Sequence, residues 1–418
     1  MSATPRPRPR RDGSVAWQVY FYYYDTDNKR RQSSETFDEY ADAQWWAELI
    51  DKVGIAEALK VLQAKRDTGS DAVLLSAWLT KYVDRMTGVQ EDGRRKYRRF
   101  ICNDIAPFFG ERAPLDAVTQ DTDAAWIVYL EQDKGNAPKT IANKHGFLSA
   151  ALRAAVEQRP TPLLPFNPCA GTRLPRHDPA EIDIFDNDEW ELFEQLLLKR
   201  WRPQAEFGLV SMARPSEVGA LLVRDVDPET GAVRINKAWK DDGTRLRLGK
   251  PKSKRGIRTV NVPLETLDRL DLDRAGDALL FHTRNDTPVT AYHFYKNAWQ
   301  PALRRLDGLS RRDFTLFTKK ALWRGADPEE LLARYSKAIN SLRGKRLSPY
   351  TLRHTGISWK LQDGVPLFVV SRDAGHESVT TTDRRYGHND RAASQSAAQV
   401  IAGRLPRVRA SLLTLAAA

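Results

Sequence analysis

The stretch LSPYTLRHTG, residues 347–356, joins a helix start to a group of polar side chains. Its serine is a preferred helix-capping residue and its proline is favoured at the first helical position, so a helix is predicted to begin here. Helical spacing then places Tyr350 and Arg353 on one face, three residues apart, with His354 pointing elsewhere. The stretch therefore predicts one guanidinium group held by a structured element.

Three other stretches place single polar side chains on structured elements. In GLVSMARPSEVGALLVRDVD, Arg214 precedes a proline that opens a predicted apolar helix. In GKPKSKRGIRTVNVP, Lys252 and Lys254 lie at the predicted tip of a hairpin. In VVSRDAGHESVTTTDRRYGH, His376 follows a glycine that can end a helix, and Tyr386 comes ten residues later. Each of these side chains, taken alone, also fits an ordinary structural role.

Length and charge narrow the class of protein. A chain of 418 residues is long enough for two or three domains, because single hydrophobic cores stop growing at roughly 250 to 300 residues. A net charge of +12 favours a polyanionic partner, with nucleic acid as the leading candidate. No stretch approaches the roughly 20 apolar residues of a membrane span, and MSATPRPRPRRDG has no apolar segment typical of a secretory signal. We therefore expect a cytoplasmic protein.

The pattern along the chain predicts a multidomain protein, mainly α with small β-sheets. Two linkers are expected, at KRDTGS and at RPTPLLPFNPCAGTRLPRHDP, whose six prolines cannot continue a helix. The expected parts are a basic flexible arm (1–12), a β-hairpin and helix (13–64), a helical domain (70–160), a domain of helices and short strands (180–405) and a C-terminal tail (406–418).

Finer patterns predict individual elements. An aromatic and β-branched run from Val15 to Tyr24 and a return strand ending near Phe37 predict a hairpin, followed by a helix in DEYADAQWWAELIDKVG. DNDEWELFEQLLLKRW predicts a helix capped by Asn187 or Asp188. AVRINKAWKDDGTRLRLGKPKSKRGIRTVNVP holds three alternating runs and predicts a small antiparallel sheet.

The two cysteines, Cys102 and Cys169, stand far apart without a CxxC pair or a neighbouring histidine in sequence. We expect plain buried thiols, and neither a disulfide framework nor a metal site.

In order and spacing, the four stretches resemble the signature of the tyrosine recombinase, or phage integrase, family. The shared pattern is Ala-Arg-x-Ser-Glu, a lysine hairpin, Leu-Arg-His-Thr, and Gly-His with a tyrosine about ten residues later. The resemblance covers nearly the whole chain and is to integrases that carry an arm-binding domain. It implies an arm-type DNA-binding domain of AP2-like sheet and helix in 13–64, a SAM-like helical core-binding domain in 70–160 and a mixed α+β catalytic domain in 180–405.

The resemblance also implies roles for residues at matching positions. Arg214 and Arg353 would stabilise the charge that builds on a DNA phosphate under attack, since guanidinium groups are always protonated and bind phosphate through two donors. Lys252 would protonate the leaving 5′ oxygen, and His376 would support the phosphate or the leaving group. Tyr386 would be the nucleophile that forms a 3′-phosphotyrosyl bond. Neither a cofactor, a metal nor ATP is expected.

Three departures leave alternatives open. Tyr350 stands where the family more often has histidine, so it is either catalytic or only supportive, and Lys254 is the alternative to Lys252 as general acid. The segment 308–345 is longer than usual and predicts an extra helical pair with nine lysines and arginines. It is either a solvated insertion or a contact for DNA or a partner.

The implied function is a site-specific recombinase of a phage or integrative element. Expected partners are core-type and arm-type double-stranded attachment sites, three further copies of the chain in a homotetramer, a host DNA-bending protein and an excisionase. No membrane is involved, and the protein would lie at the nucleoid. A resolvase usually lacks the arm domain, a DNA-binding regulator would form no covalent adduct, and a metal-dependent nuclease lacks its carboxylate pair here.

Overall fold

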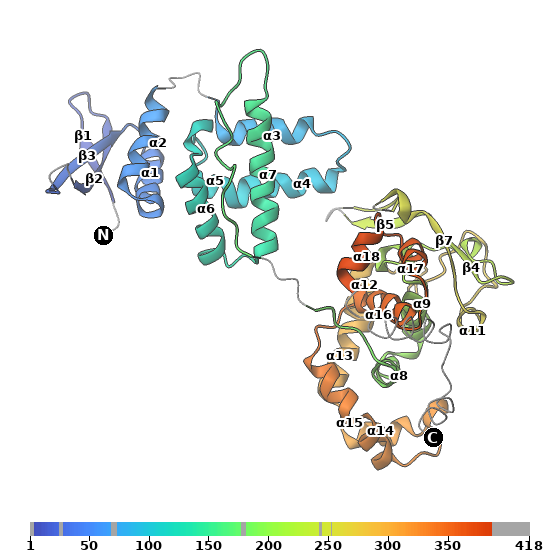
Figure 1. Ribbon diagram of the computed structural model, residues 1–418. Helices are drawn as coiled ribbons and strands as arrows, with labels where there is room; N and C mark the ends of the chain where they lie inside the picture. Colours follow the sequence, from blue (N-terminus) through green and yellow to red (C-terminus); the bar gives the residue numbers. More distant parts are fainter. Residues whose placement is uncertain are drawn as a thin grey trace, which may run out of the picture. The chain divides into compact units, whose positions relative to one another are not determined.

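The computed structural model describes residues 4–24, 28–67, 73–176, 181–241, 245–251 and 253–386. These ranges are mostly helical with small antiparallel sheets, as the sequence predicts (Figure 1). The chain divides into two compact units, residues 1–179 and 180–418. Among the helices of the described ranges, none has the length and apolar character needed to cross a membrane.

The first unit begins with a three-stranded antiparallel sheet followed by two helices. Its elements are β1 (Pro5–Pro9), β2 (Val15–Tyr24), β3 (Arg30–Phe37), α1 (Tyr40–Val53) and α2 (Ile55–Asp67). The predicted hairpin is confirmed, with Trp17 of β2 opposite Phe37 of β3. Strand alternation buries Val19 and Phe21, and the ring of Phe21 lies 5.3 Å from that of Trp46 on α1.

The prediction of a flexible arm over residues 1–12 is wrong for Pro5–Pro9, which forms β1 and pairs with β2. Alternating prolines exclude a helix but are tolerated in an edge strand, which pairs on one side only. Arg6 lies opposite Gln18 and Arg8 opposite Ala16, so these two residues keep backbone N–H groups for the pairing.

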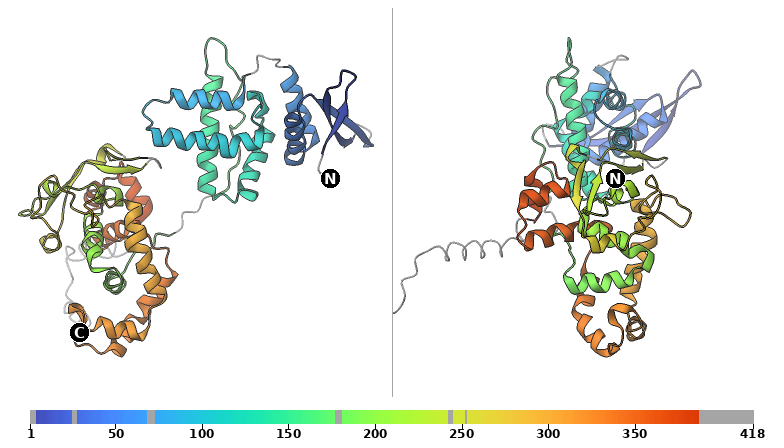
Figure 2. Two further views of the ribbon diagram at one scale, coloured as in Figure 1. Left: turned by 180° about the vertical axis from the view of Figure 1, so that it is seen from behind. Right: turned by 90° about the vertical axis from the view of Figure 1, so that its right-hand side faces the viewer.

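The rest of the first unit is helical. The helices are α3 (Leu75–Arg85), α4 (Glu91–Phe100), α5 (Ala106–Phe109), α6 (Gln120–Gln132) and α7 (Pro138–Val156). Helix α7 crosses α3, which it contacts (Figure 2).

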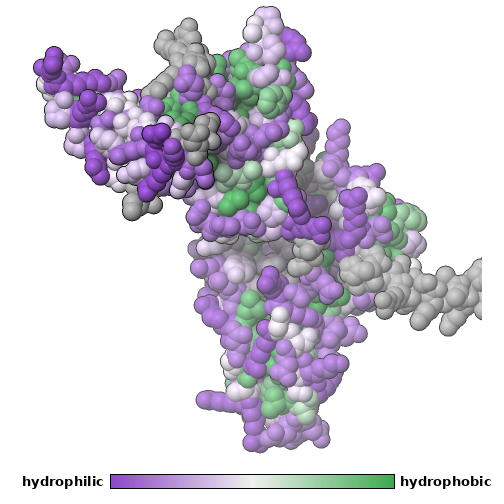
Figure 3. Space-filling view, turned by 60° about the vertical axis from the view of Figure 1, so that its left-hand side comes forward, coloured by the Kyte–Doolittle hydropathy of each residue, from purple (hydrophilic) through white to green (hydrophobic). Residues whose placement is uncertain are grey.

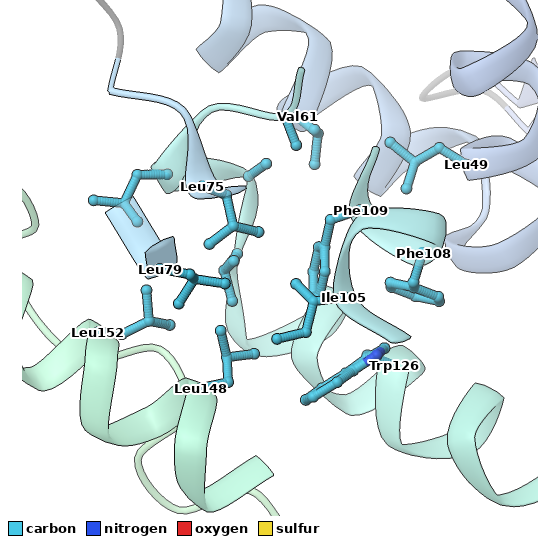
Figure 4. Close-up of a cluster of buried hydrophobic side chains, with 14 of the residues drawn as sticks. Leu49, Val61, Leu75, Leu79, Ile105, Phe108, Phe109, Trp126, Leu148 and Leu152 are labelled. Carbon is cyan, nitrogen blue, oxygen red and sulfur yellow. The ribbon is translucent and has the colours of Figure 1, made fainter. Parts of the chain in front are cut away.

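One continuous core joins the N-terminal sheet and its helices to the helical bundle. Leu49 of α1 and Val61 of α2 belong to the same buried cluster as Leu148 and Trp126 (Figure 4). The proline-rich segment after α7 contributes to this cluster as well, through Leu164 and other side chains. The surface in Figure 3 is largely hydrophilic, with separate hydrophobic patches.

The second unit is a mainly helical body with two small sheets. Its elements are α8 (Asn187–Leu196), α9 (Arg202–Ser211), α10 (Pro215–Val218), β4 (Ala232–Ile235), β5 (Ala238–Asp241), β6 (Leu246–Gly249), β7 (Arg258–Asn261), α11 (Leu264–Leu267), α12 (Ala291–Phe294), α13 (Gln300–Asp307), α14 (Arg311–Phe317), α15 (Pro328–Gly344), α16 (Pro349–Gln362), α17 (Leu367–Ala374) and α18 (Val379–Tyr386).

Two local predictions differ from this structure. The strands form two separate pairs, β4 with β7 and β5 with β6, instead of one sheet of three. Helix α8 is capped by Asp186, one residue earlier than predicted, and Asp186 and Glu189 cap each other's backbone N–H groups. The extra helical pair predicted within 308–345 is present as α14 and α15.

Close packing of α16 on α9 sets the position of the charged side chains. A Cβ atom at Gly356 would lie 2.1 Å from the Leu209 carbonyl oxygen, so only glycine permits this approach. Helix α16 starts at Pro349 with Ser348 as its N-cap, as predicted.

Candidate active site

A buried carboxylate organises two arginines at the start of α10. Arg214 is the N-cap residue of α10, and its backbone N–H and its Nη1 donate to Glu217 at 2.9 and 2.8 Å. Arg258 of β7 donates from Nη2 to the same carboxylate at 3.0 Å. The Glu217 side chain is completely buried, whereas that of Arg214 is 19% exposed. Arg214 is therefore held rigidly and is still accessible to a ligand.

The charge state of Glu217 follows from these partners. Burial by itself raises the pKa of a carboxyl group, but the guanidinium groups of Arg258 and Arg214 lower that of Glu217 below its ordinary value. Glu217 is thus ionised, and it orients both arginines through charged hydrogen bonds.

Arg353 enters the same site from α16. It is 4% exposed, and its Nη1 donates to the Met212 carbonyl oxygen at 2.6 Å. Met212 ends α9 in the left-handed conformation, with φ of 54°, which is uncommon for a residue other than glycine. Burial, and then the charge of Arg214, lower the pKa of Arg353 to about 10. Two guanidinium groups therefore stand close together in a site of low solvation.

The turn after α17 brings in His376. Gly375 ends α17 with φ of 68°, and a Cβ atom there would lie 2.9 Å from Nη1 of Arg258. Arg258 also donates from Nε to the Asp373 carbonyl oxygen at 2.5 Å. His376 is 8% exposed, and its Nδ1 lies 2.7 Å from the Thr382 hydroxyl on α18. The same arginine that binds Glu217 thus fixes the turn that carries His376.

Tyr386, the last residue of α18, is 1% exposed. Its hydroxyl lies 2.5 Å from Nδ1 of His354. The prediction that His354 points away from the site is wrong, because α18 folds back beside α16. Burial raises the pKa of Tyr386 to about 12, although the charges of Arg353 and Arg385 act in the opposite direction. The phenol is therefore protonated at neutral pH.

The structure does not gather every predicted residue equally. It places Arg214, Arg353, His376 and Tyr386 in one charged cluster, in which burial and then the arginines lower the pKa of His376. Tyr350 is 46% exposed, its ring centroid 6.3 Å from that of His354.

The predicted lysine hairpin is wrong, because β6 and β7, the strands on either side of the two lysines, pair with β5 and β4 and not with each other. Lys252 lies outside the described residues, and Lys254 is exposed at the start of a short turn, Lys254–Gly256. The segment after Tyr386, including the predicted tail 406–418, also lies outside the described residues.

Two further residues of the cluster, Glu217 and Arg258, have no predicted role, although Glu217 is the acid of the Arg-x-Ser-Glu motif. Each has a signal in the sequence. Glu217 stands three residues after Arg214, the spacing of a helix-capping acid, and Arg258 alternates with the buried Val260 along its strand. His354 follows Arg353 directly, but nothing local indicates that α18 returns to it.

One group of possible metal ligands is found in the described part of the first unit. The donor atoms of Asp123, His145 and Cys169 all lie within 4.8 Å of one another, although they are distant in sequence. His145 Nε2 lies 3.0 Å from Oδ2 of Asp123, and Thr172 donates to that oxygen at 2.6 Å. Burial, and then the charge of Asp123, raise the pKa of Cys169, so it is a thiol, and thiols are poor metal ligands. The group is best described as a buried polar cluster that attaches residues 169–172 to α6 and α7.

The expectation of two buried thiols holds for Cys169, which is 3% exposed, and is wrong for Cys102, which is exposed.

His354 and His376 link stability to pH. Burial and then neighbouring arginines lower the pKa of each from 6.5 to about 4. Between these values the unfolded chain binds protons that the folded chain does not, so stability is full above pH 6.5 and falls toward pH 4. The expected loss is on the order of 3 kcal/mol for each histidine. Urea unfolding at pH 7.5 and pH 4 measures it, and the double variant His354→Gln/His376→Gln should lose part of the pH dependence. An unchanged pH dependence in that variant would contradict the assignment.

Comparison with known proteins is consistent with this geometry. Residues 198–393 match the model of the phage integrase family. The chain is 26% identical over 337 residues to a XerC-like tyrosine recombinase of Caldanaerobacter subterraneus, a match that covers 75% of this chain and 78% of the relative. It is also 26% identical over 256 residues to the prophage integrase IntR of Escherichia coli, a match that covers 61% of this chain and 58% of the relative.

Solved structures show the same fold. The integrase of transposon Tn1549 in complex with circular intermediate DNA aligns with a TM-score of 0.60 at 18% identity, over 79% of this chain and all of that chain. A lambda integrase tetramer bound to a Holliday junction aligns with a TM-score of 0.51 at 15% identity, over 94% of this chain and 97% of that chain.

Proposed function

We propose that the chain is a tyrosine recombinase of the phage integrase family, as the match over residues 198–393 supports, and that it cuts and rejoins DNA at attachment sites through Tyr386. The supporting observation is the buried cluster in which the charge of Arg214 acts on Arg353 and the charge of Arg353 acts on Tyr386. The element that carries it would be a phage or an integrative element.

The arginines are proposed to bind the non-bridging oxygens of one DNA phosphate. Attack on the phosphorus concentrates negative charge on these oxygens, and preorganised guanidinium groups stabilise that charge without rearranging. Glu217 supports this task by accepting one hydrogen bond from the Arg214 guanidinium and one from its backbone N–H. The Met212 carbonyl accepts one hydrogen bond from the Arg353 guanidinium.

The covalent step forms one bond and breaks another. The Tyr386 oxygen bonds to phosphorus, the bond from phosphorus to the 5′ oxygen breaks, and that oxygen takes a proton from Lys252, or from Lys254 as the alternative. His376 supports the phosphate or the leaving oxygen. Tyr350 is proposed to be supportive, since its exposed phenol is a poor base near neutral pH. A 5′ hydroxyl from another strand reverses the step.

Covalent capture tests the proposal. The protein is incubated in EDTA with nicked duplexes that tile the DNA flanking its gene, and adducts that resist denaturation are collected and sequenced. We expect a protein–DNA adduct on a small set of duplexes. A protein that binds these duplexes and forms no adduct on any of them is a DNA-binding regulator, and the proposal would be wrong.

The N-terminal sheet is proposed to bind arm-type DNA through the face opposite α1. Tyr20, Tyr22 and Tyr24 are exposed there. Arg6 lies over the ring of Tyr20 at 5.6 Å, and Arg30 over that of Tyr22 at 4.0 Å. Guanidinium groups at such positions contact DNA phosphates. The tyrosine rings beneath them restrict their motion through cation–π contacts.

The double variant Arg6→Ala/Arg30→Ala should weaken binding to arm-type duplexes and leave core-site cleavage intact. The loss of two phosphate contacts should reduce the slope of the logarithm of the DNA-binding constant against the logarithm of the salt concentration by about 2. Fluorescence anisotropy over a salt series measures this slope. Arg10→Ala is the matched control, because Arg10 is already paired with Asp38. An equal effect of both changes would contradict the proposed face. Deletion of residues 1–64 is a poorer test, since Leu49 and Val61 belong to the shared core.

The proposed assembly is a homotetramer on core-type DNA, with a host DNA-bending protein and an excisionase as further partners. DNA strand exchange by transesterification is nearly neutral in energy, so its direction has to come from such partners.

A further inference from the structure

We propose that His354 accepts the proton of Tyr386 as the tyrosine attacks the phosphate. The inference rests on the proposed function and adds a residue that the sequence signature does not assign to the chemistry. It starts from one contact, the 2.5 Å separation between Nδ1 of His354 and the Tyr386 hydroxyl.

The direction of this hydrogen bond follows from the two groups. Burial, and then the charges of Arg385 and Arg353, lower the pKa of His354 to about 4, while burial raises that of Tyr386 to about 12. At neutral pH the imidazole is neutral and the phenol is protonated. The O–H of Tyr386 therefore donates, and Nδ1 of His354 accepts.

Other candidate bases are placed less well. Nδ1 of His376 is already occupied by the Thr382 hydroxyl at 2.7 Å. Tyr350 is exposed on the first turn of α16, and a neutral phenol is a poor base. Within the described part of the chain, His354 is the basic side chain in hydrogen-bond contact with the attacking oxygen.

The step balances without a further reagent. As the Tyr386 oxygen bonds to phosphorus, its proton becomes far more acidic and moves to Nδ1 of His354. The bond to the 5′ oxygen breaks, and that oxygen takes its proton from Lys252, or from Lys254 as the alternative. The arriving phosphate offsets the charges of Arg353 and Arg385 that face His354, so the imidazole becomes a better acceptor when substrate is bound. In the reverse step His354 returns the proton to the tyrosine.

Single-turnover adduct formation on a captured nicked duplex tests this role. His354→Asn keeps an oxygen that can accept the hydrogen bond but cannot take a proton. If His354 only positions the tyrosine, this variant keeps most of the rate. We expect it to lose at least about 100-fold, the lower range for general base catalysis. His282→Asn, a histidine of the same unit outside the cluster, is the matched control and should keep the rate.

Fluorinated tyrosine at position 386 separates proton transfer from positioning. Ring fluorine lowers the phenol pKa, so 3,5-difluorotyrosine needs less help from a base. We expect difluorotyrosine to raise the rate of His354→Asn at least about tenfold and to change the wild-type rate much less. A His354→Asn variant as fast as wild type, or no preferential rescue by fluorination, would overturn the proposal.

Two controls keep the outcomes distinct. Thermal unfolding and DNA binding show whether His354→Asn is folded, and His354→Gln takes its place in both measurements if it is not. A wild-type protein that forms no adduct refutes the proposed function itself. A wild-type adduct with an unimpaired histidine variant refutes only the role of His354.

Discussion

Tyr386→Phe is expected to abolish the covalent protein–DNA adduct while DNA binding remains. The substitution removes one oxygen atom, and that atom is the proposed nucleophile, so no slower route to the phosphotyrosyl bond is left. The aromatic ring still fills its buried position beside Ile357 and Val370 in the hydrophobic cluster of α16 to α18. Denaturing gels after incubation with the captured duplex measure the adduct, and a gel shift measures binding.

Tyr335→Phe is the matched control for this experiment. Tyr335 is also fully buried, and its hydroxyl accepts a hydrogen bond from Trp323 at 3.2 Å, but it lies in α15, outside the charged cluster. We expect its adduct yield to match that of the wild type. An adduct that persists in Tyr386→Phe would assign the nucleophile to another residue and remove the mechanism proposed above.

Glu217→Ala should be the most destabilising single change in the site. It leaves Arg214 and the 4% exposed side chain of Arg258 without their carboxylate, and breaking a buried ion pair from one side costs about 3–5 kcal/mol. Glu217→Gln keeps an acceptor oxygen and the shape of the side chain, so its loss should be smaller. Urea unfolding followed by tryptophan fluorescence measures the difference in free energy of unfolding.

The comparison for Glu217 is a surface ion pair. Glu329 pairs with Arg311 at 2.6 Å, with side chains 57% and 71% exposed. Glu329→Ala should change the free energy of unfolding by about 0–1 kcal/mol. A Glu217→Ala variant no less stable than Glu329→Ala would show that the arginines do not depend on the carboxylate. Activity is expected to fall in both Glu217 variants, because Arg214 loses its fixed orientation.

Local sequence patterns predict many helices and strands of this fold, because helix caps and strand alternation depend on residues that are close in sequence. The serine and proline before Tyr350 mark the start of α16, and alternation along β2 separates buried from exposed side chains. Apart from the cap of α8, which is misplaced by one residue, the failures in the fold concern contacts between distant segments. Nothing local shows that Pro5–Pro9 finds a partner strand or that α1 shares a core with Leu148.

The same distinction applies to the site. The order of the motifs predicts Arg214, Arg353, His376 and Tyr386, whose cluster the structure describes but whose roles stay predictions. The contact of His354 with Tyr386 depends on how α18 packs against α16, which no periodicity reveals. Sequence patterns identify the side chains of such a site more readily than their hydrogen-bond partners.

The cluster around Glu217 has an electrostatic consequence. Arg214, Arg258 and Arg353 contribute three positive charges and Glu217 one negative charge, which leaves a net charge of +2. This equals the charge of one divalent cation, but it is attached to the polypeptide and cannot be removed by a chelator or by dilution. The charge of the site therefore depends on folding and not on a bound ion, so a chelator that leaves the second unit intact also leaves this charge in place.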